Sequence, residues 1–393
     1  MTQPPVRCHR ALVVGAGDSA RAALQEAGVP EVTTLGGELL GSRFDDATQT
    51  WLLTTNGGET VRARVVVAAH PPARVPWLPD IAGRDGFLGE SFHAAQWPAG
   101  FDPVGKRVAV IGADSTAGHY IPRLIKSAAS VTVFAHPPRR VVDELPLPAT
   151  RAKRWLRRRI RPATDAQARP ALVRSAVVAI TPSRIRTADG AEHDADAIVY
   201  GTGFAMPDTI SGETAWHDGM EPYFGVALRG FPNYFFLGGP DTGAQARYIA
   251  ECVAQMDRTD STRIEVRRSS QRVFNERVYV RAAEPQPVAS AFELTSGAIG
   301  HDATYEGAAT LTIAGSDHPV RVRLAGHLDP IDGHYHWQGT VFGSATLPGE
   351  SLKQARTATL TVGERSAPAR IIERTPWGTH TVAGVGAPPY ALS

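Results

Sequence analysis

Cysteine and long apolar runs are the features that this sequence has least of. The 393 residues include two cysteines, Cys8 and Cys252, which excludes a disulfide framework and a paired-cysteine metal site. No window of about 18 apolar residues is present, although a membrane span requires one. The first ten residues lack the apolar core of a signal peptide. We therefore expect a cytoplasmic protein without a membrane span and with reduced thiols.

Charge of one sign is also scarce. The chain has 41 Lys and Arg residues against 39 Asp and Glu residues, a net charge of +2, which does not favour a nucleic-acid partner. The low net charge and a hydrophobic content of 42% exclude wholesale disorder. The length fits two or three domains, and 38 glycines with 30 prolines predict many turns.

Two parts of the chain repeat the order of strand, glycine-containing turn and helix. The first has the apolar run Ala11–Val14 followed by a helical stretch at 20–27. The second has the run Arg107–Ile111, a helical stretch ending at Ser127 and another strand at 131–134. This repeat predicts an α/β fold with two Rossmann-like dinucleotide-binding units.

The predicted domain boundaries place the second unit inside the first. The first unit is expected to comprise residues 1–98 and 194–283, and the second unit residues 104–193. Residues 284–300 begin with a proline-containing stretch and are predicted to be a linker. Residues 301–393 alternate between apolar and polar side chains with intervening glycine turns, which predicts an all-β barrel or sandwich.

The first glycine turn has the sequence GAGDSA and begins at Gly15. Such a turn brings backbone N–H groups and a helix N-terminus against a pyrophosphate, so Gly15, Gly17 and Ala20 are candidate contacts for an ADP moiety. A tight turn without a ligand is the alternative. The acidic residue that binds the ribose at the end of the second strand is missing, because Gly36 stands there.

The second turn begins at Gly112 and has Asp114 where a second glycine is expected. A carboxylate adds bulk and negative charge where a pyrophosphate approaches the backbone. Gly112 and Ser115 are still candidate nucleotide contacts, and Arg139 and Arg140 are candidate contacts for a 2′-phosphate. The alternative is a fold element that no longer binds nucleotide, with an exposed arginine pair.

The most specific pattern lies between the two units. Phe87, Gly89, His93, Trp97 and Pro98 follow the spacing FxGxxxHxxxWP, which by composition arises by chance in fewer than about one in a thousand such chains. This stretch resembles the fingerprint of Baeyer–Villiger monooxygenases, within the flavin-containing (class B) monooxygenase superfamily.

The resemblance covers about residues 11–283. It includes the strand that ends at Gly203 and the stretches around Trp216, Pro232 and Asp241. It implies an FAD-type unit followed by the fingerprint as a connector and by an inserted NADP-type unit. FAD and either NADP or NAD are the implied cofactors, with Gly203 and Asp241 among their contacts.

The resemblance also implies a chemistry. In such enzymes NADPH reduces FAD, and the flavin with O₂ oxygenates a ketone, amine or sulfide, while the protein supplies positioning and electrostatics. His93 and Trp97 are then expected to couple the domains, and Arg161 to stabilise the oxygenated flavin. Arg161 belongs to a basic run, so a solvated basic helix face is the alternative for it.

Three departures from the family pattern fall on the FAD pocket. The chain passes from Leu35 to Arg43 without the acidic ribose ligand or the GGTW-like loop. His70 stands where glycine is usual, and Ala244 follows Gly243 where a Gly-His-x-Ser stretch is usual. The departures converge on one pocket and predict an altered or lost flavin site.

The all-β part resembles an uncharacterised domain found behind monooxygenase-like proteins. His334 and His336 share one face of a predicted strand, and with His327 or His380 they offer metal-ligand chemistry. Packing at a barrel rim or an interface is the favoured alternative, so no metal site is assigned.

Two functional hypotheses follow. The first is an FAD- and NAD(P)H-linked monooxygenase with an eroded flavin site. The second is a non-catalytic relative that uses the scaffold to bind a small molecule or a protein partner. No Ser/His/Asp triad or paired carboxylates indicate another enzyme class. Assembly into a homo-oligomer is left open.

Overall fold

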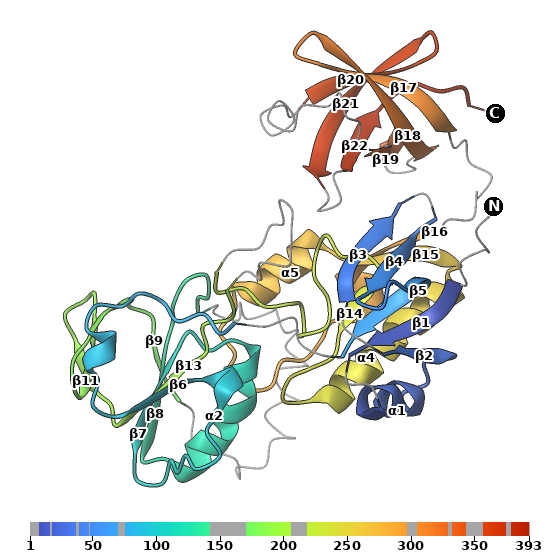
Figure 1. Cartoon of the computed structure of the whole chain (residues 1–393). Helices are drawn as coiled ribbons and strands as arrows, with labels where there is room; N and C mark the ends of the chain where they lie inside the picture. The colour runs from blue at the N-terminus through green and yellow to red at the C-terminus, as the bar shows by residue number, and fades with distance from the viewer. Residues whose placement is uncertain are drawn as a thin grey trace, which may run out of the picture.

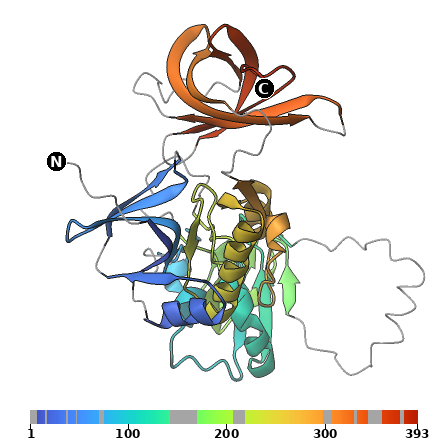
Figure 2. The ribbon, with the colours of Figure 1, turned by 90° about the vertical axis from the view of Figure 1, so that its right-hand side faces the viewer.

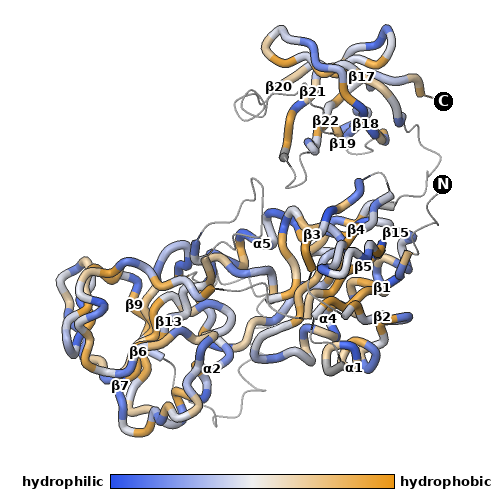
Figure 3. The backbone as a smooth tube through the Cα atoms, viewed as in Figure 1, coloured by the Kyte–Doolittle hydropathy of each residue, from blue (hydrophilic) through white to orange (hydrophobic). Residues whose placement is uncertain are grey.

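The structure, a computed structural model, contains two α/β units and a barrel (Figure 1). It describes residues 8–15, 18–36, 39–46, 48–69, 75–141, 170–205, 218–296, 305–328, 332–342, 357–374 and 379–392. Within these residues, no helix combines the length and apolar character that a bilayer crossing needs. The central strands of both sheets are the most hydrophobic parts of the two units (Figure 3).

A six-stranded sheet forms the first unit. Its strands are β1 (Cys8–Val14), β2 (Val32–Leu35), β3 (Leu39–Asp45), β4 (Thr50–Thr55), β5 (Thr60–Ala68) and β14 (Tyr234–Phe236). β1 lies between β2 and β5 and is parallel to both. The other edge of β5 is shared, because β4 pairs with its first half in antiparallel fashion and β14 with its second half in parallel.

Helices α1 (Asp18–Glu26) and α4 (Thr242–Arg258) cover this sheet, and their apolar side chains share a core with β1 and β5. β15 (Ser261–Val266) and α5 (Arg268–Asn275) follow α4. The strand predicted at 11–14 and the helix predicted at 20–27 are therefore present.

The predicted linker is wrong over part of its length. α6 (Val288–Ala291) and β16 (Phe292–Ser296) belong to the first unit, and β16 pairs antiparallel with β15. Val288, Ala291 and Phe292 are buried in the core of that unit. These apolar side chains stabilise the core of the first unit, although the prolines before them led to the prediction of a linker.

The second unit is built on a five-stranded parallel sheet. In spatial order its strands are β6 (Glu90–His93), β13 (Ala197–Tyr200), β7 (Arg107–Ile111), β8 (Ser130–Phe134) and β9 (Ala171–Val173). Helix α2 (Ser115–Ser127) and the 3₁₀ helix η2 (Ala94–Gln96) pack on this sheet, and the 3₁₀ helix η1 (Arg84–Gly86) precedes β6. A separate antiparallel sheet contains β10 (Val177–Ile180), β11 (Arg184–Thr187) and β12 (Glu192–Asp194).

β6 and β13 lie in this second sheet, although the sequence division placed their residues with the first unit. β13 fills the space between β6 and β7 and pairs in parallel with both. All four of its side chains are buried. A short apolar run predicts a buried strand, but it does not reveal which sheet the strand joins.

The C-terminal part is a closed six-stranded antiparallel barrel, seen as a ring in Figure 2. Its strands are β17 (Tyr305–Ile313), β18 (Ser316–Leu328), β19 (Tyr335–Phe342), β20 (Thr357–Val362), β21 (Arg365–Arg374) and β22 (His380–Val385). Alternate side chains such as Leu311, Val322 and Leu360 fill its interior. The all-β prediction is confirmed, with the barrel as the form adopted.

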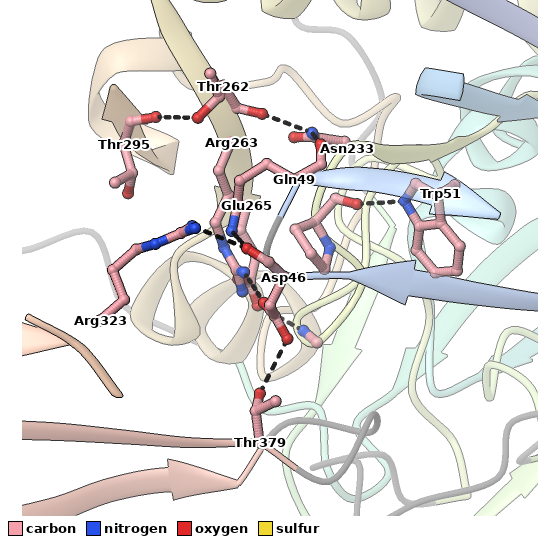
Figure 4. A network of polar contacts seen from close by, with 12 residues as sticks. Asp46, Gln49, Trp51, Asn233, Thr262, Arg263, Glu265, Thr295, Arg323 and Thr379 are labelled. Carbon is pink, nitrogen blue, oxygen red and sulfur yellow. Dashed lines mark hydrogen bonds and ion pairs between the residues drawn. The ribbon is translucent and has the colours of Figure 1, made fainter. Parts of the chain in front are cut away.

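A buried polar network around Asp46 joins the barrel to the first unit (Figure 4). Arg263 Nη1 of β15 donates to Asp46 Oδ1 at 2.9 Å, and Arg263 Nη2 donates to Glu265 Oε2 at 2.8 Å. From the barrel, Thr379 Oγ1 donates to Asp46 Oδ2 at 3.2 Å, and Arg323 Nη1 donates to the Asp46 carbonyl at 2.9 Å. One residue of the β3–β4 turn thus contacts both bodies.

Replacing Asp46 is expected to destabilise the protein more than replacing its neighbour. Asp46→Asn removes a buried charge from Arg263 and should cost about 2 to 3 kcal/mol, as for a buried hydrogen bond to a charged group. The control Asp45→Asn removes a partly exposed ion pair with Arg62 and should cost less than about 1 kcal/mol. Urea unfolding of both variants measures the difference, and equal losses would contradict the role given to Asp46.

Candidate dinucleotide sites

The turn between β7 and α2 is the best-defined candidate site. Gly112 has a φ of +92°, and a Cβ at this position would lie 2.5 Å from the carbonyl oxygen of Gly201, just after β13. Only glycine fits such a close approach without strain. Gly112 is therefore needed for packing of the turn against β13, whether or not a nucleotide binds.

Asp114 turns into the protein. Its Oδ1 accepts from the Ala117 N–H at 2.8 Å and caps α2, and its Oδ2 accepts from the Gly203 N–H at 3.0 Å. The residue is fully buried, and burial raises the pKa of the carboxyl while the Arg139 charge lowers it. The residue that replaces a glycine of the motif thus fixes the loop after β13 to the start of α2.

The N-terminus of α2 is occupied by a carboxylate of the chain itself. The backbone N–H of Ser115 donates to Glu221 Oε1 at 2.9 Å, and Ser115 Oγ donates to Glu221 Oε2 at 2.6 Å. A helix N-terminus is a ready site for an anion because its first N–H groups lack helical partners and its dipole favours negative charge. Glu221 takes the place that a phosphate would use.

The two candidate 2′-phosphate contacts point to different environments. Arg139 is buried, where its Nη1 donates to the Gly219 carbonyl at 2.8 Å and its Nη2 to Glu221 Oε1 at 3.3 Å. Arg140 is exposed and pairs with Glu276 at 2.6 Å. Arg139, a candidate contact for the 2′-phosphate, is therefore already paired with the Glu221 carboxylate at the N-terminus of α2.

Glu221 is held from its backbone as well. Asn275 of α5 accepts from the Glu221 N–H at 2.7 Å and donates to its carbonyl at 3.0 Å. The Tyr279 N–H donates to the Ala113 carbonyl at 2.9 Å, so the chain after α5 crosses the same turn. The pKa of Glu221 is raised by burial and by the nearby Asp114 carboxyl.

The fingerprint residues pack inside the second unit. His93 is buried, its Nδ1 accepts from the Ala95 N–H at 3.1 Å, and its ring lies 5.6 Å from that of Phe204. Trp97 stacks on Tyr120 with ring centroids 4.4 Å apart. Their coupling and catalytic roles stay predictions, while the contacts observed here are those of a core.

The first unit keeps part of a dinucleotide turn. Gly15 follows β1 with a φ of 103°, α1 begins at Asp18, and Ala20 is buried. Gly17 lies outside the described residues, as does Arg161. β2 ends at Leu35, and the exposed Gly36 supplies no carboxylate for a ribose. These residues fit a pyrophosphate better than they fit a complete FAD.

The two remaining predicted contacts have local partners. Gly203 has a φ of +80°, and a Cβ there would lie 2.2 Å from the Gly219 carbonyl, so the position requires glycine for packing. Asp241 caps α4 by accepting from the Ala244 N–H at 2.9 Å and is exposed. Both residues are explained by the fold, and their cofactor roles stay predictions.

The described histidines of the barrel lie apart or make local contacts. Within the described part of the chain, no group of three or more His, Cys, Asp or Glu residues is placed to hold an ion. His336 Nε2 lies 2.6 Å from Asp332 Oδ2, and the rings of His327 and His336 stack at 6.2 Å. His380 begins β22, whereas His336 pairs with its last residue, so these two occupy opposite ends of that strand.

Sequence reasoning identified Ser115 and Arg139 but missed Glu221 and Asn275. Glu221 closely follows Gly219 in a stretch that the family resemblance covers, yet an isolated glutamate carries no pattern. Asn275 ends an amphipathic helix, and nothing in its neighbours indicates a clamp. Only the folded chain brings these residues to α2.

Acid is expected to destabilise the protein through His93. Burial lowers the pKa of His93 from 6.5 to about 4, so the folded state binds this proton less readily than the unfolded chain does. Its stabilising contribution is complete above about pH 6.5 and decreases by about 3 kcal/mol as the pH falls to about 4. His93→Asn retains an acceptor for Ala95 without the titration. Urea unfolding at several pH values should show the two stabilities converging, and parallel curves would contradict this assignment.

Comparisons with known proteins cover different parts of the chain. Residues 302–392, the barrel, match a family described as "Domain of unknown function (DUF4873)". An oxidized steroid monooxygenase bound to NADP is 17% identical with a TM-score of 0.33, covering 74% of this chain and 100% of that one. A closed crystal structure of cyclohexanone monooxygenase is 18% identical with a TM-score of 0.30, covering 68% and 88%.

Curated relatives are found at two levels of similarity. The Baeyer-Villiger monooxygenase of Pseudomonas aeruginosa is 25% identical over 340 residues, 63% of this chain and 64% of the relative. That of Streptomyces coelicolor is 27% identical over 324 residues, 59% and 62%. The chain thus spans less than two thirds of either enzyme.

The "Uncharacterized protein Rv0943c" of Mycobacterium tuberculosis is 60% identical over 316 residues, 76% of this chain and 89% of the relative. This chain belongs to the same family as the mycobacterial protein, and Baeyer–Villiger monooxygenases are its distant homologues.

Proposed function

We propose that this chain is a non-catalytic relative of the Baeyer–Villiger monooxygenases, a binding protein that does not oxidise NADPH. The observation that carries the proposal is the Glu221 carboxylate on the first residue of α2, where a nicotinamide dinucleotide would place its phosphates. The residues of the second unit do not fit that cofactor, because the two groups that would receive it, Ser115 and Arg139, are already paired with Glu221.

Charge supports the same conclusion. A dinucleotide would bring further negative charge beside two buried carboxyls, Asp114 and Glu221, whose charge is offset by Arg139. Like charges in a buried site repel strongly, and the low dielectric increases that cost. Binding would therefore require Glu221 to leave first.

Removing Glu221 from α2 is costly. Its side chain would give up two hydrogen bonds to Ser115 and the Arg139 ion pair, and the Asn275 clamp holds its backbone in place. Hydrogen bonds to charged groups are each worth about 1.5 to 3 kcal/mol, and a stranded buried arginine adds to the loss. The other hypothesis, an NADPH-linked monooxygenase, has to overcome this cost at every turnover.

The flavin is part of the same proposal. The first unit has a positive-φ glycine after β1 but no carboxylate at the end of β2. These features suit an ADP-like fragment of a small ligand, and no redox step is assigned to this unit. A small molecule or a protein partner, not a substrate undergoing oxygenation, is then what the scaffold binds.

Three measurements on the whole chain test this proposal. Wild type is expected to show no saturable binding of NADP⁺ by calorimetry up to about 1 mM, no flavin absorbance and no O₂-dependent loss of NADPH. Stoichiometric flavin with O₂-dependent NADPH oxidation would overturn it.

Variants test whether Glu221 is the cause. Glu221→Ala frees Ser115 and Arg139, so affinity for inorganic pyrophosphate should increase at least about tenfold over wild type. The control Glu276→Ala removes a half-buried glutamate, the partner of the exposed Arg140, and should leave pyrophosphate affinity unchanged. Equal pyrophosphate affinity in all three folded proteins would contradict the assignment. If Glu221→Ala fails to fold, the wild-type measurements still decide the proposal.

A further inference from the structure

One end of the barrel gathers aromatic side chains. The strand register places the end of β18, the start of β19 and the end of β22 side by side, and the start of β17 pairs with Leu324 of β18. Four aromatic residues lie at this end, which we call the aromatic end: Tyr305, Tyr335, Trp337 and Tyr390. Tyr305 stacks on Tyr390 with ring centroids 6.3 Å apart, so the C-terminal segment after β22 closes onto β17.

Glycines make room for the central ring. Trp337 pairs with Gly326 on one neighbouring strand and Gly384 on the other. A Cβ on Gly384 would lie 2.3 Å from Trp337 Cζ2, and one on Gly326 would lie 2.5 Å from a ring carbon of Tyr335. Glycines on β18 and β22 therefore leave room for the rings of Tyr335 and Trp337 on β19, the strand between them.

The polar atoms of these rings lack partners. Trp337 is 1% exposed and Tyr390 is 2% exposed. Within the described residues, the Trp337 Nε1 and the hydroxyls of Tyr335 and Tyr390 have no hydrogen-bond partner. Buried donors without partners are rare because each costs the free energy of its lost hydration. The hydroxyls of Tyr335 and Tyr390 are neighbours that can pair with each other, whereas the buried indole N–H of Trp337 can only donate, which indicates that something outside the chain accepts its hydrogen bond.

The side chains around these rings indicate the chemistry of the acceptor. The side chains packed around these rings in the barrel core are apolar or aromatic. His336 pairs with Asp332 and stacks on His327, and along β19 it lies between the inward-facing Tyr335 and Trp337. Leu328 and Leu392, next to the aromatic residues in the fold or the chain, are 66% and 52% exposed.

We propose that the aromatic end of the barrel binds a neutral, largely apolar small molecule that carries a carbonyl-type hydrogen-bond acceptor. The indole N–H can only donate, so the ligand must accept. A charged ligand would enter a cluster without a counter-ion, at a high desolvation cost. The mouths of β-barrels are recurrent sites for such ligands. The site is independent of the closed second unit, so either proposal can fail alone.

Calorimetry on the full-length protein tests the site with matched probes. Methyl octanoate is neutral and carries a carbonyl, whereas octanoate has the same chain with a negative charge at neutral pH. Methyl octanoate is expected to bind with one site per chain, and octanoate at least about tenfold more weakly.

Two variants identify the donor. Trp337→Phe keeps an aromatic ring and removes the N–H, and should weaken methyl octanoate binding about tenfold, as for one lost hydrogen bond. Tyr120→Phe, a hydroxyl deletion on the second unit, is the control and should bind like wild type.

Several outcomes would overturn the proposal. One is the absence of binding heat with methyl octanoate up to about 1 mM. Another is equal affinity in wild type and Trp337→Phe, which would mean that internal water satisfies the donors. A third is tighter binding of octanoate than of its ester. If Trp337→Phe loses its folded circular dichroism signal, Tyr390→Phe takes its place in the same comparison.

Discussion

The bond between the Glu221 carboxylate and Ser115 determines what the second unit of this protein can do. It ties the segment before β14 to the first residue of α2, and through Asn275 it ties both to α5. Arg139, which follows β8, completes the arrangement. A parallel sheet with a glycine turn is normally open at this edge, because ligands use the helix N-terminus there. Here an internal anion makes the same contacts.

The balance of charge explains why this arrangement persists in a buried place. Asp114 and Glu221 are both fully enclosed, and Arg139 lies with them, so a lone charge is avoided only while the three stay together. Burial raises the pKa of both carboxyls, and each carboxyl also receives backbone N–H bonds that favour its charged form. Removing one of these three side chains would leave another buried charge without its partner. Such a loss destabilises the protein by more than the intact cluster stabilises it.

Local pattern predicted much of the fold and little of the site. The runs Ala11–Val14 and Arg107–Ile111 and the alternation of the barrel strands are periodic, and the structure contains strands at each place. The sheet that β13 joins and the packing of Phe292 depend on distant partners, so local sequence could not reveal them. Ser115 and Glu221 are 106 positions apart. The sequence alone shows that Gly36 supplies no carboxylate at the end of β2. It does not show that the Glu221 carboxylate lies at the N-terminus of α2.

The barrel contacts the first unit at Asp46. Thr379, next to the start of β22, contacts Asp46, whereas the aromatic end lies where β22 finishes. Arg323, the other barrel residue that contacts Asp46, pairs with Glu306 next to Tyr305, whereas the apolar rim near Leu328 is exposed. A ligand at that rim need not break the Asp46 network to enter. The chain thus combines an α/β scaffold in which Glu221 occupies the N-terminus of α2 and a barrel in which the buried Trp337 N–H has no partner among the described residues.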